Sequence, residues 1–299
     1  METIAANNVI KTYKDGTKAL RGISMGIQSD EIFCVVGPNG AGKTTLMRII
    51  GTQLMPSNGS LTILGIDVVK NAADIRKHLA VVPQEVMPDL QLTAEEHVFY
   101  YLCTRGENRV KARSRTEEYL KLLNMWEHRK KPALKLSGGL RRRILIAMAM
   151  ATGADILLLD EPTSGLDPVA RRETWNLLNE LKVSRTIVLT THSMEEAEAI
   201  ADRVAIINSG VIISFGTVGQ LRQRLPTREK IYIGNGMRRE SVQRFGKVET
   251  YGGRLVLYPK DQKAIDEVVH LAVDNKFEIS VLPTTLEDVY VEFVSGARQ

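Results

Sequence analysis

The stretch GPNGAGKTT, residues 37–45, constrains the fold of this chain more than any other part of the sequence. It lies between the apolar run IFCVV and the segment LMRII. A short apolar run before glycines predicts a buried parallel strand, and LMRII continues at helical spacing. Glycines permit positive φ and close backbone approach, so successive N–H groups can surround an anion at a helix N-terminus. The complete pattern G-x-x-x-x-G-K-[ST] therefore predicts a phosphate-binding loop, against the alternative of a flexible turn.

This loop contains most of the nucleotide-binding residues that the sequence predicts. They are Gly37, Pro38, Asn39, Gly40, Ala41, Gly42, Lys43, Thr44 and Thr45. Lys43 has the length to reach the outer phosphates of a nucleotide, and the Thr44 hydroxyl is suited to bind Mg²⁺. The motif alone predicts a nucleotide but not the reaction.

Size and composition predict a globular protein with one large and one small domain, because the chain has 299 residues. Apolar residues make up 43% and charged residues 25%, which is ordinary for such proteins. No apolar run approaches the ~20 residues of a membrane span, and the start METIAANNVIKTYKDG lacks a signal-peptide pattern. We therefore expect that the chain itself does not cross a bilayer. Cys34 and Cys103 have no metal-ligand spacing and fit a reducing compartment.

The net charge of +5 would suit nucleic acid or merely a surface near anionic lipid. The basic clusters at 128–131, 141–143 and 238–239 are short, and none is interleaved with aromatic residues. Such clusters are usually solvated surface charge. We therefore expect no nucleic-acid partner.

The order of expected elements predicts an α/β fold. Two strands flank the turn KDG near the N-terminus, and GSLTILGIDV predicts a second strand pair. The sequence pattern of residues 88–152 predicts helices, with a T-x-x-E capping box at Thr93 and Glu96. Strands and helices then alternate, and an S-x-x-E box at Ser193 and Glu196 begins one of the helices. This alternation predicts a mainly parallel sheet with helices on both faces.

A polar stretch around residues 217–230 predicts a domain boundary. We expect a nucleotide-binding domain over residues 1–222, with an antiparallel N-terminal part and a helical subdomain inserted at about 88–152. Residues 223–299 contain enough expected strands and helices for a small accessory α+β domain.

Two further segments contain candidate catalytic and anion-binding residues. ILLLDEP ends a buried strand in Asp160, which is placed to hold Mg²⁺ through water, and Glu161, which is within reach of an attacking water as a general base. LSGGL places Ser137, Gly138 and Gly139 before a helix, where they form a second anion site. Solvated acids and an ordinary turn are the plain alternatives. A second site far away in sequence suggests that it binds the same nucleotide from another subunit.

The motifs GPNGAGKTT, Gln84, LSGGL, ILLLDEP, SGLD (164–167) and TTH (190–192) occur in the order and approximate spacing of the ATP-binding cassette (ABC) ATPases. Residues ~1–220 resemble this family, which implies a P-loop NTPase fold, ATP as substrate and Mg²⁺ as cofactor. Gln84 resembles the glutamine that contacts Mg²⁺ and the attacking water. His192 resembles the histidine that binds the γ-phosphate and orients Glu161.

The resemblance also implies roles at the edges of the site. Tyr13 resembles the aromatic that stacks on adenine, with packing as the alternative. Asp167 resembles the aspartate that contacts the partner subunit, and it is also suited to cap the helix that begins at Pro168. One departure is Leu140, which stands where many members have glutamine. The backbone of the turn and Ser137 remain, so we expect activity to survive.

LSGGLRRR and the segment PTTLEDVYVEF resemble the ATPase subunits of ABC-2 drug and antibiotic exporters. Arg141, Arg142 and Arg143 are equally well interpreted as solvated helix residues. The resemblance implies an ATPase that powers transport by a separate polytopic membrane permease, through closure of a head-to-tail dimer with a second ATPase subunit. It also implies a peripheral location on the cytoplasmic face of the membrane. A soluble ABC ATPase acting on DNA or the ribosome is the alternative, and a single-site P-loop kinase leaves LSGGL unexplained.

Overall fold

In the computed structural model, which describes residues 2–182, 185–234 and 238–296, a six-stranded sheet organises the first of two units. Its strand order is β10-β9-β3-β8-β7-β6, and the neighbours from β9 to β6 are parallel. The bounds are β3 (Ile32–Val36), β6 (Leu79–Val82), β7 (Ile156–Asp160), β8 (Thr186–Thr191), β9 (Arg203–Asn208) and β10 (Val211–Gly216). Every residue of β3, β7 and β8 is buried, as is typical of parallel strands covered on both faces. The predicted parallel sheet is confirmed.

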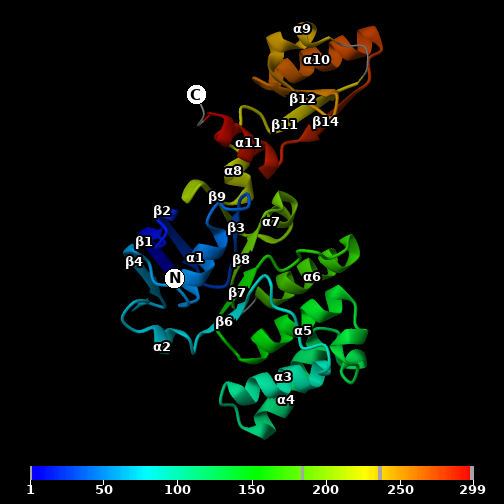
Figure 1. Cartoon of the computed structure of the whole chain (residues 1–299). Coiled ribbons are helices and arrows are strands. Elements are labelled where there is room, and N and C mark those ends of the chain that lie inside the picture. The colour runs from blue at the N-terminus through cyan, green and yellow to red at the C-terminus, as the bar shows by residue number, and fades with distance from the viewer. Residues whose placement is uncertain (1, 183–184, 235–237, 297–299) are drawn as a thin grey trace. The chain divides into compact units, whose positions relative to one another are not determined.

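Helices cover both faces of this sheet. Figure 1 shows α1 on one face and α5, α6 and α7 on the other. Their bounds are α1 (Lys43–Ile50), α5 (Gly138–Ala151), α6 (Pro168–Leu181) and α7 (Met194–Ile200). Phe33 and Val35 of β3 join Leu46 and Ile50 of α1 in one buried apolar cluster. Burial of each such large side chain stabilises the fold by roughly 1.5–3 kcal/mol, which fixes α1 and the loop before it against the sheet.

An antiparallel sheet of order β2-β1-β4-β5 packs into the same apolar cluster. Its strands are β1 (Glu2–Thr12), β2 (Lys18–Gln28), β4 (Asn58–Ile63) and β5 (Ile66–Asp67), and the short helix α2 (Ala72–Ile75) follows. Both hairpins predicted from the sequence are confirmed by the antiparallel pairing of β1 with β2 and of β4 with β5.

The predicted helical segment contains α3 (Ala94–Thr104) and α4 (Arg109–Leu122), and it ends with α5. The short 3₁₀ helices η1 (Trp126–His128) and η2 (Ala133–Lys135) connect α4 to α5. The capping box before α3 forms in both directions: Glu96 N–H donates to Thr93 Oγ1 at 3.2 Å, and Thr93 N–H donates to Glu96 Oε2 at 2.8 Å. The capping box predicted there is therefore confirmed.

The second predicted capping box, at the start of α7, forms only in part. Ser193 Oγ accepts the N–H of Glu196 at 3.2 Å, but the Glu196 carboxylate does not return to the cap. It is buried and accepts hydrogen bonds from Thr163 Oγ1 (2.6 Å) and Trp175 Nε1 (3.0 Å). The prediction was wrong for this half of the box, because two buried donors far away in sequence compete for the same carboxylate.

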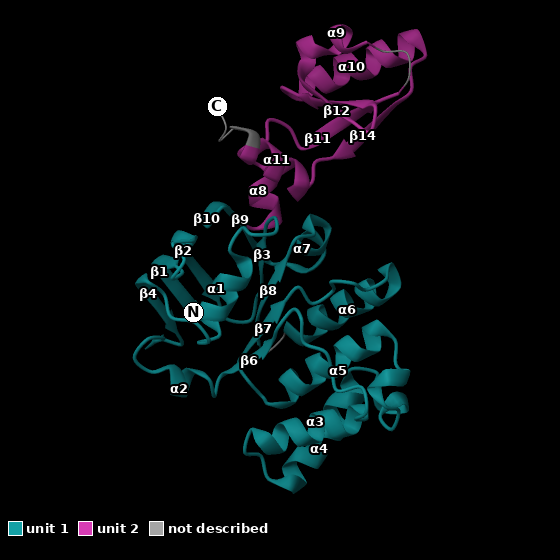
Figure 2. Ribbon diagram, in the orientation of Figure 1, with its two compact units in different colours: residues 1–215 teal, residues 216–299 magenta. Residues whose placement is uncertain are grey.

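The second unit, Gly216–Gln299 (Figure 2), contains an antiparallel sheet of order β12-β13-β11-β14. Its elements are α8 (Val218–Arg222), β11 (Glu229–Ile233), α9 (Arg239–Val242), η4 (Gln243–Phe245), β12 (Gly246–Tyr251), β13 (Arg254–Pro259), α10 (Gln262–Asn275), β14 (Ile279–Pro283) and α11 (Leu286–Gly296). From β11 to β14 the chain order is β-α-β-β-α-β, the ferredoxin-like arrangement. The predicted small α+β fold is confirmed. The first unit ends at Phe215, and the predicted domain limit after residue 222 stays a prediction.

A buried polar network ties α11 to the sheet of the second unit. Lys230 Nζ donates to both carboxylate oxygens of Asp288, at 2.9 and 2.8 Å, and the Tyr258 hydroxyl donates to Asp288 Oδ1 at 2.8 Å. Burial and this hydrogen bond raise the pKa of Tyr258. Burial alone would raise the pKa of Asp288, but the hydrogen bonds from Lys230 and Thr285 outweigh it and hold that pKa below its ordinary value. The network is therefore fully formed at neutral pH.

Candidate functional site

Four chain segments meet at the carboxyl ends of neighbouring strands of the six-stranded sheet. The glycine-rich loop follows β3, His192 follows β8, Glu161 follows β7, and Gln84 comes two residues after β6. These strands are adjacent in the order β3-β8-β7-β6. The carboxyl edge of such a sheet is where open α/β folds bind their ligands. Residues up to 155 positions apart in sequence (His192 minus Gly37) thus share one site.

The loop at 37–45 has the geometry of a phosphate cradle. Gly40 and Gly42 have φ of +78° and +106°, in the region that favours glycine. A Cβ atom on Gly37 would lie 2.1 Å from the backbone oxygen of Ile207, which is closer than atoms can approach. The buried Lys43 side chain donates to the carbonyls of Gly37 (2.8 Å) and Pro38 (3.1 Å). The loop therefore fits the phosphates of a nucleotide at the N-terminus of α1.

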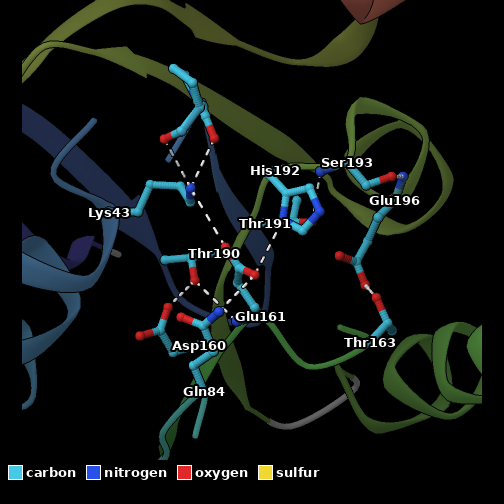
Figure 3. A network of polar contacts seen from close by, with 12 residues as sticks. Lys43, Gln84, Asp160, Glu161, Thr163, Thr190, Thr191, His192, Ser193 and Glu196 are labelled. Atoms are coloured by element: carbon cyan, nitrogen blue, oxygen red, sulfur yellow. Dashed lines mark hydrogen bonds and ion pairs between the residues drawn. The ribbon is translucent and has the colours of Figure 1, made fainter. Parts of the chain in front are cut away.

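The carboxylate of Glu161 is the point on which the other predicted catalytic side chains converge (Figure 3). Gln84 Nε2 donates to Glu161 Oε2 at 3.0 Å, and His192 Nδ1 lies 3.1 Å from the same oxygen. Lys43 Nζ is 3.6 Å from Oε1. An ionised carboxylate only accepts hydrogen bonds, so with Glu161 ionised Nδ1 of His192 is the donor of that bond. Glu161 is buried, whereas the side chain of His192 is 56% exposed, so the imidazole remains accessible to solvent.

Glu161 adopts a backbone conformation that is rare for a side-chain-bearing residue, with φ of +47°. Such a conformation costs roughly 1–3 kcal/mol and is typical of functional sites. Its N–H donates to both the carbonyl and the hydroxyl oxygen of Thr190, each at 3.1 Å. The Thr190 hydroxyl in turn donates to the carboxylate of Asp160. The end of β7 is thus fixed by its neighbour β8.

A cavity of about 450 Å³ adjoins this cluster and contains all three predicted metal ligands. Its lining residues are Thr44, Met47, Arg48, Gln53, Val81, Pro83, Gln84, Glu85, Val86 and Asp160. A hydroxyl, an amide oxygen and a carboxylate are the oxygen ligands that Mg²⁺ prefers, and Mg²⁺ beside phosphates needs only one or two protein ligands. The residues present therefore fit Mg²⁺ bound together with a nucleotide.

Tyr13 lies beside the first turn of α1. Its hydroxyl is 3.1 Å from Thr45 Oγ1, and Lys11 Nζ lies 5.7 Å from the centre of its ring. The ring is half-buried. The structure thus brings the predicted adenine-stacking residue to the edge of the phosphate loop.

The turn at residues 137–139 belongs to a different part of the unit. Ser137 Oγ accepts the N–H of Leu140 at 3.3 Å and so caps α5. A Cβ atom on Gly139 would lie 2.8 Å from the Cβ of Ala170, in α6. Within the described part of the chain, no hydrogen bond or ion pair connects residues 137–139 to the loop at 37–45.

Asp167 caps α6, as one of its two predicted roles requires. Its Oδ1 accepts the N–H groups of Val169 (2.9 Å) and Ala170 (3.0 Å), and Pro168 occupies the first turn of the helix. Asp167 is exposed, and α6 packs against Gly139 in the turn at 137–139.

The interpretation of the three consecutive arginines as solvated helix residues was wrong for Arg142, which is buried, whereas Arg141 and Arg143 are half-buried. Arg141 donates to the carbonyls of Ala133 and Leu134 at 2.8 and 2.9 Å, and Arg143 pairs with Glu173. Arg142 is buried. Its guanidinium donates to backbone carbonyls next to the cluster around Glu161.

Sequence reasoning missed Arg142, although a signal was present. In α5 the small or apolar residues Gly139, Ile146 and Ala149 lie at spacings of three and four from Arg142 or from one another, and all four are buried, so they share one face of the helix. Arg142 occupies a position on that face that an apolar residue would normally fill.

The fold and the cluster around Glu161 define a P-loop NTPase of the cassette type. The model of the ABC transporter family matches residues 20–164. The doxorubicin resistance ATP-binding protein DrrA of Mycobacterium tuberculosis is 37% identical over 223 residues, which cover 74% of this chain and 67% of that protein. DrrA of Streptomyces peucetius, a daunorubicin/doxorubicin resistance ATP-binding protein, is 34% identical over the same shares of both chains.

ATP-binding cassette sub-family A member 7 of Rattus norvegicus is 39% identical over 208 residues, or 69% of this chain. This chain spans only 10% of the length of that relative.

Solved structures give the same result. CbiO1 of Clostridium perfringens, part of the ABC transporter complex cbiONQ, has a TM-score of 0.67 and 27% identity, over 75% of this chain and 96% of that one. A dimeric ATP-binding cassette in a post-hydrolysis state, bound to ADP and Pi, has a TM-score of 0.64 and 29% identity, over 72% and 98%. The chain therefore belongs to the ABC transporter family, and it is an ABC-type ATPase cassette.

The predicted family and fold are thus confirmed, and the two DrrA proteins agree with the predicted resemblance to drug-exporter ATPases. Among the described residues, no helix has the length and apolar content that crossing a membrane requires.

Proposed function

We propose that this chain is the ATP-hydrolysing cassette of an exporter, and that it energises a separate polytopic membrane permease by ATP-driven closure with a second cassette. The observation that carries the proposal is the convergence of Lys43, Gln84 and His192 on the buried carboxylate of Glu161. This arrangement unites a cation, an amide and an imidazole around one general base at the edge of a phosphate loop.

In the proposed reaction, water attacks the γ-phosphorus of ATP, a new O–P bond forms, and the bond between the γ-phosphorus and the β,γ-bridging oxygen breaks to leave ADP and phosphate. Glu161 accepts the proton of the water as general base. Gln84 and His192, which both hydrogen-bond to Glu161 Oε2, hold that carboxylate in one orientation. Lys43 stabilises the charge that develops on the transferred phosphoryl group.

Mg²⁺ would be held by Thr44, Gln84 and, through water, Asp160, which line one cavity. When bound, the ion neutralises charge on the β- and γ-phosphates. Tyr13, beside Thr45, supports stacking on adenine.

The second half of each site would come from a second cassette. Ser137 caps α5, and Gly138 and Gly139 begin it, so their backbone N–H groups can bind an anion. Among the described residues, no hydrogen bond or ion pair joins them to the phosphate loop of their own chain. Asp167, which caps α6, would contact the partner subunit. The relative solved with ADP and Pi is dimeric, and this supports the head-to-tail arrangement.

The permease and the location on the cytoplasmic face of the membrane rest on the relatives. The two DrrA proteins are named as drug-resistance ATP-binding proteins, and cbiO1 is part of a transporter complex. Residues 1–222 would form the nucleotide-binding domain, with the helices of 88–152 as the moving subdomain, and residues 223–299 the accessory domain. Purification from membranes with a permease would support this proposal, whereas recovery with ribosomes or DNA alone would favour the soluble alternative.

The direct test of hydrolysis is the steady-state release of phosphate by wild type and by Glu161→Gln. The amide keeps the shape of the side chain but does not accept a proton from water, so kcat should fall by about 10²–10⁴-fold. Glu173→Gln, which changes a carboxylate on the outer side of α6, is the matched control and should keep wild-type kcat. Equal activity of Glu161→Gln and wild type would contradict the proposed mechanism.

A further inference from the structure

The side chain of Arg142 is buried among backbone carbonyls of the catalytic segments. Its Nε donates to the carbonyl of Pro162 at 3.0 Å, Nη2 to that of Asp160 at 3.1 Å, and Nη1 to that of Pro83 at 3.3 Å. Its exposed fraction is 9%. One planar guanidinium therefore connects α5 to the segments that follow β6 and β7.

The three acceptors flank the two side chains that act on water. Asp160 and Pro162 are the residues immediately before and after Glu161, and Pro83 immediately precedes Gln84. Arg142 thus fixes the backbone on both sides of Glu161 and next to Gln84. Because these two side chains meet in a 3.0 Å hydrogen bond, their relative position depends on the same guanidinium.

The backbone of Glu161 needs such contacts because its conformation is unfavourable. With φ of +47°, the residue is held in a conformation that a free chain would leave. The N–H of Glu161 is fixed by Thr190, and the carbonyls on either side of it are fixed by Arg142. Two independent contacts therefore hold the general base in place.

Burying the charged side chain of Arg142 is unfavourable, and a need for packing at this position does not account for it. Burial lowers the pKa of Arg142 to about 10, against the opposing effect of the carboxylates of Asp160 and Glu196. Its three hydrogen bonds within the described part of the chain go to neutral carbonyls. A cation taken out of water without a contacting carboxylate is expensive, and an apolar side chain would fill this helix face at lower cost.

We propose that Arg142 is a positioning residue for ATP hydrolysis, which sets Glu161 and Gln84 relative to each other and links both to α5. The proposal rests on the proposed function of Glu161. Since Ser137 caps the N-terminus of α5, about one and a half helical turns before Arg142, a nucleotide bound at residues 137–139 acts through a rigid helix on the catalytic segments of the same chain. Arg142 itself does not touch the nucleotide.

The test compares Arg142→Gln and Arg142→Lys with two controls in the same helix. Arg141→Gln also removes hydrogen bonds to two carbonyls, but those of Ala133 and Leu134. Arg143→Gln removes the ion pair with Glu173. In Arg142→Gln, kcat should fall by about 10- to 100-fold, the range expected for a small misplacement of catalytic groups. KM and the Kd for ATP should stay within about twofold of wild type, because binding does not use Arg142.

Arg142→Lys should recover part of kcat, because an ammonium donates to one or two of the three carbonyls. Combination with Gln84→Ala should reduce the effect of Arg142→Gln, because one of the two positioned groups is then already absent. The Arg141 and Arg143 controls should keep wild-type kcat. Wild-type kcat in Arg142→Gln, or parallel losses in kcat and ATP affinity, would overturn the proposal.

Hydrogen exchange separates this proposal from the proposed function. In Arg142→Gln or, if that variant does not fold, Arg142→Lys, peptides that cover residues 83–86 and 160–163 should exchange at least about threefold faster than in wild type and in Arg143→Gln. Unchanged exchange in these peptides would overturn the positioning role even if Glu161 is catalytic. Faster exchange in a protein without hydrolysis would instead contradict only the proposed function.

Discussion

The hydroxyl of Thr190, near the end of β8, donates a hydrogen bond to the carboxylate of Asp160, the paired residue at the end of β7. The same hydroxyl accepts the N–H of Glu161 at 3.1 Å. One threonine thus orients the proposed magnesium ligand and supports the strained backbone of the proposed general base. Both residues therefore depend on the Thr190 hydroxyl.

Thr190→Val should therefore weaken the response to Mg²⁺. Valine has the shape of threonine but leaves a buried carboxylate oxygen without its donor, which costs about 1–3 kcal/mol of the free energy of unfolding. The Mg²⁺ concentration for half-maximal ATP hydrolysis should rise. Thr186→Val, at the other end of β8, also removes a hydroxyl with backbone partners and should leave the Mg²⁺ dependence unchanged. A Thr190→Val protein with wild-type Mg²⁺ dependence would argue against this role of Asp160.

Gly37→Ala should abolish nucleotide binding. The added methyl group would lie 2.1 Å from the backbone oxygen of Ile207, so the phosphate loop or β9 must move. Binding of a fluorescent ATP analogue reports this directly. Gly65→Ala is the control, because that glycine also has a positive φ, of +75°, but has open space around it. This substitution therefore introduces backbone strain without a steric clash. Tight ATP binding by Gly37→Ala would show that the loop does not hold the phosphates.

Ser137→Arg should abolish hydrolysis while the same subunit still binds ATP. The large cation would occupy the proposed anion site of the turn and keep a second cassette away, whereas the phosphate loop at 37–45 is unchanged. Ser137→Ala removes only the cap of α5 and should lower the free energy of unfolding by about 0.5–2 kcal/mol. Phosphate release and ATP binding are measured in parallel. Normal hydrolysis by Ser137→Arg would mean that the turn is not part of a nucleotide site.

Asp288→Asn should destabilise the second unit in a pH-dependent manner. Breaking the buried pair with Lys230 costs about 3–5 kcal/mol. The folded-state pKa of Asp288 lies below its ordinary value of 3.8, so the stabilisation by the carboxylate is complete above pH 3.8 and is lost as the pH falls through the folded pKa. Urea unfolding of wild type and variant should therefore differ most near pH 7 and progressively less toward pH 3. Asp266→Asn, on the exposed side of α10, is the control. If wild type and Asp288→Asn differed in the free energy of unfolding by the same amount at every pH, the stabilising role of the ionised Asp288 carboxylate would be contradicted.

Much of this fold could be predicted from local sequence patterns, because each pattern has a local physical cause. The run IFCVV predicts a strand covered on both faces, and all five of its residues are buried. Thr93 and Glu96 are three residues apart, so their reciprocal cap needs no distant partner. The phosphate loop is also a local feature, because the glycines whose positive φ it needs lie within a few residues of one another.

The parts that could not be predicted depend on contacts between distant residues. Glu196 leaves its expected cap because Thr163 and Trp175, far away in sequence, offer buried donors. The burial of Arg142 depends on three carbonyls from two other segments. The positive φ of Glu161 follows from its contacts with β8, which no nearby residue reveals. Such contacts arise only after the sheet and helices are assembled.

The central claim, that two cassettes close around ATP and each completes the site of the other, is tested most directly by the molar mass of Glu161→Gln in solution. With ATP and Mg²⁺, light scattering coupled to size exclusion should give twice the mass of one chain. Without nucleotide, or with the further substitution Ser137→Arg, it should give the mass of a single chain. A Glu161→Gln protein that binds ATP yet keeps the mass of one chain would contradict the account.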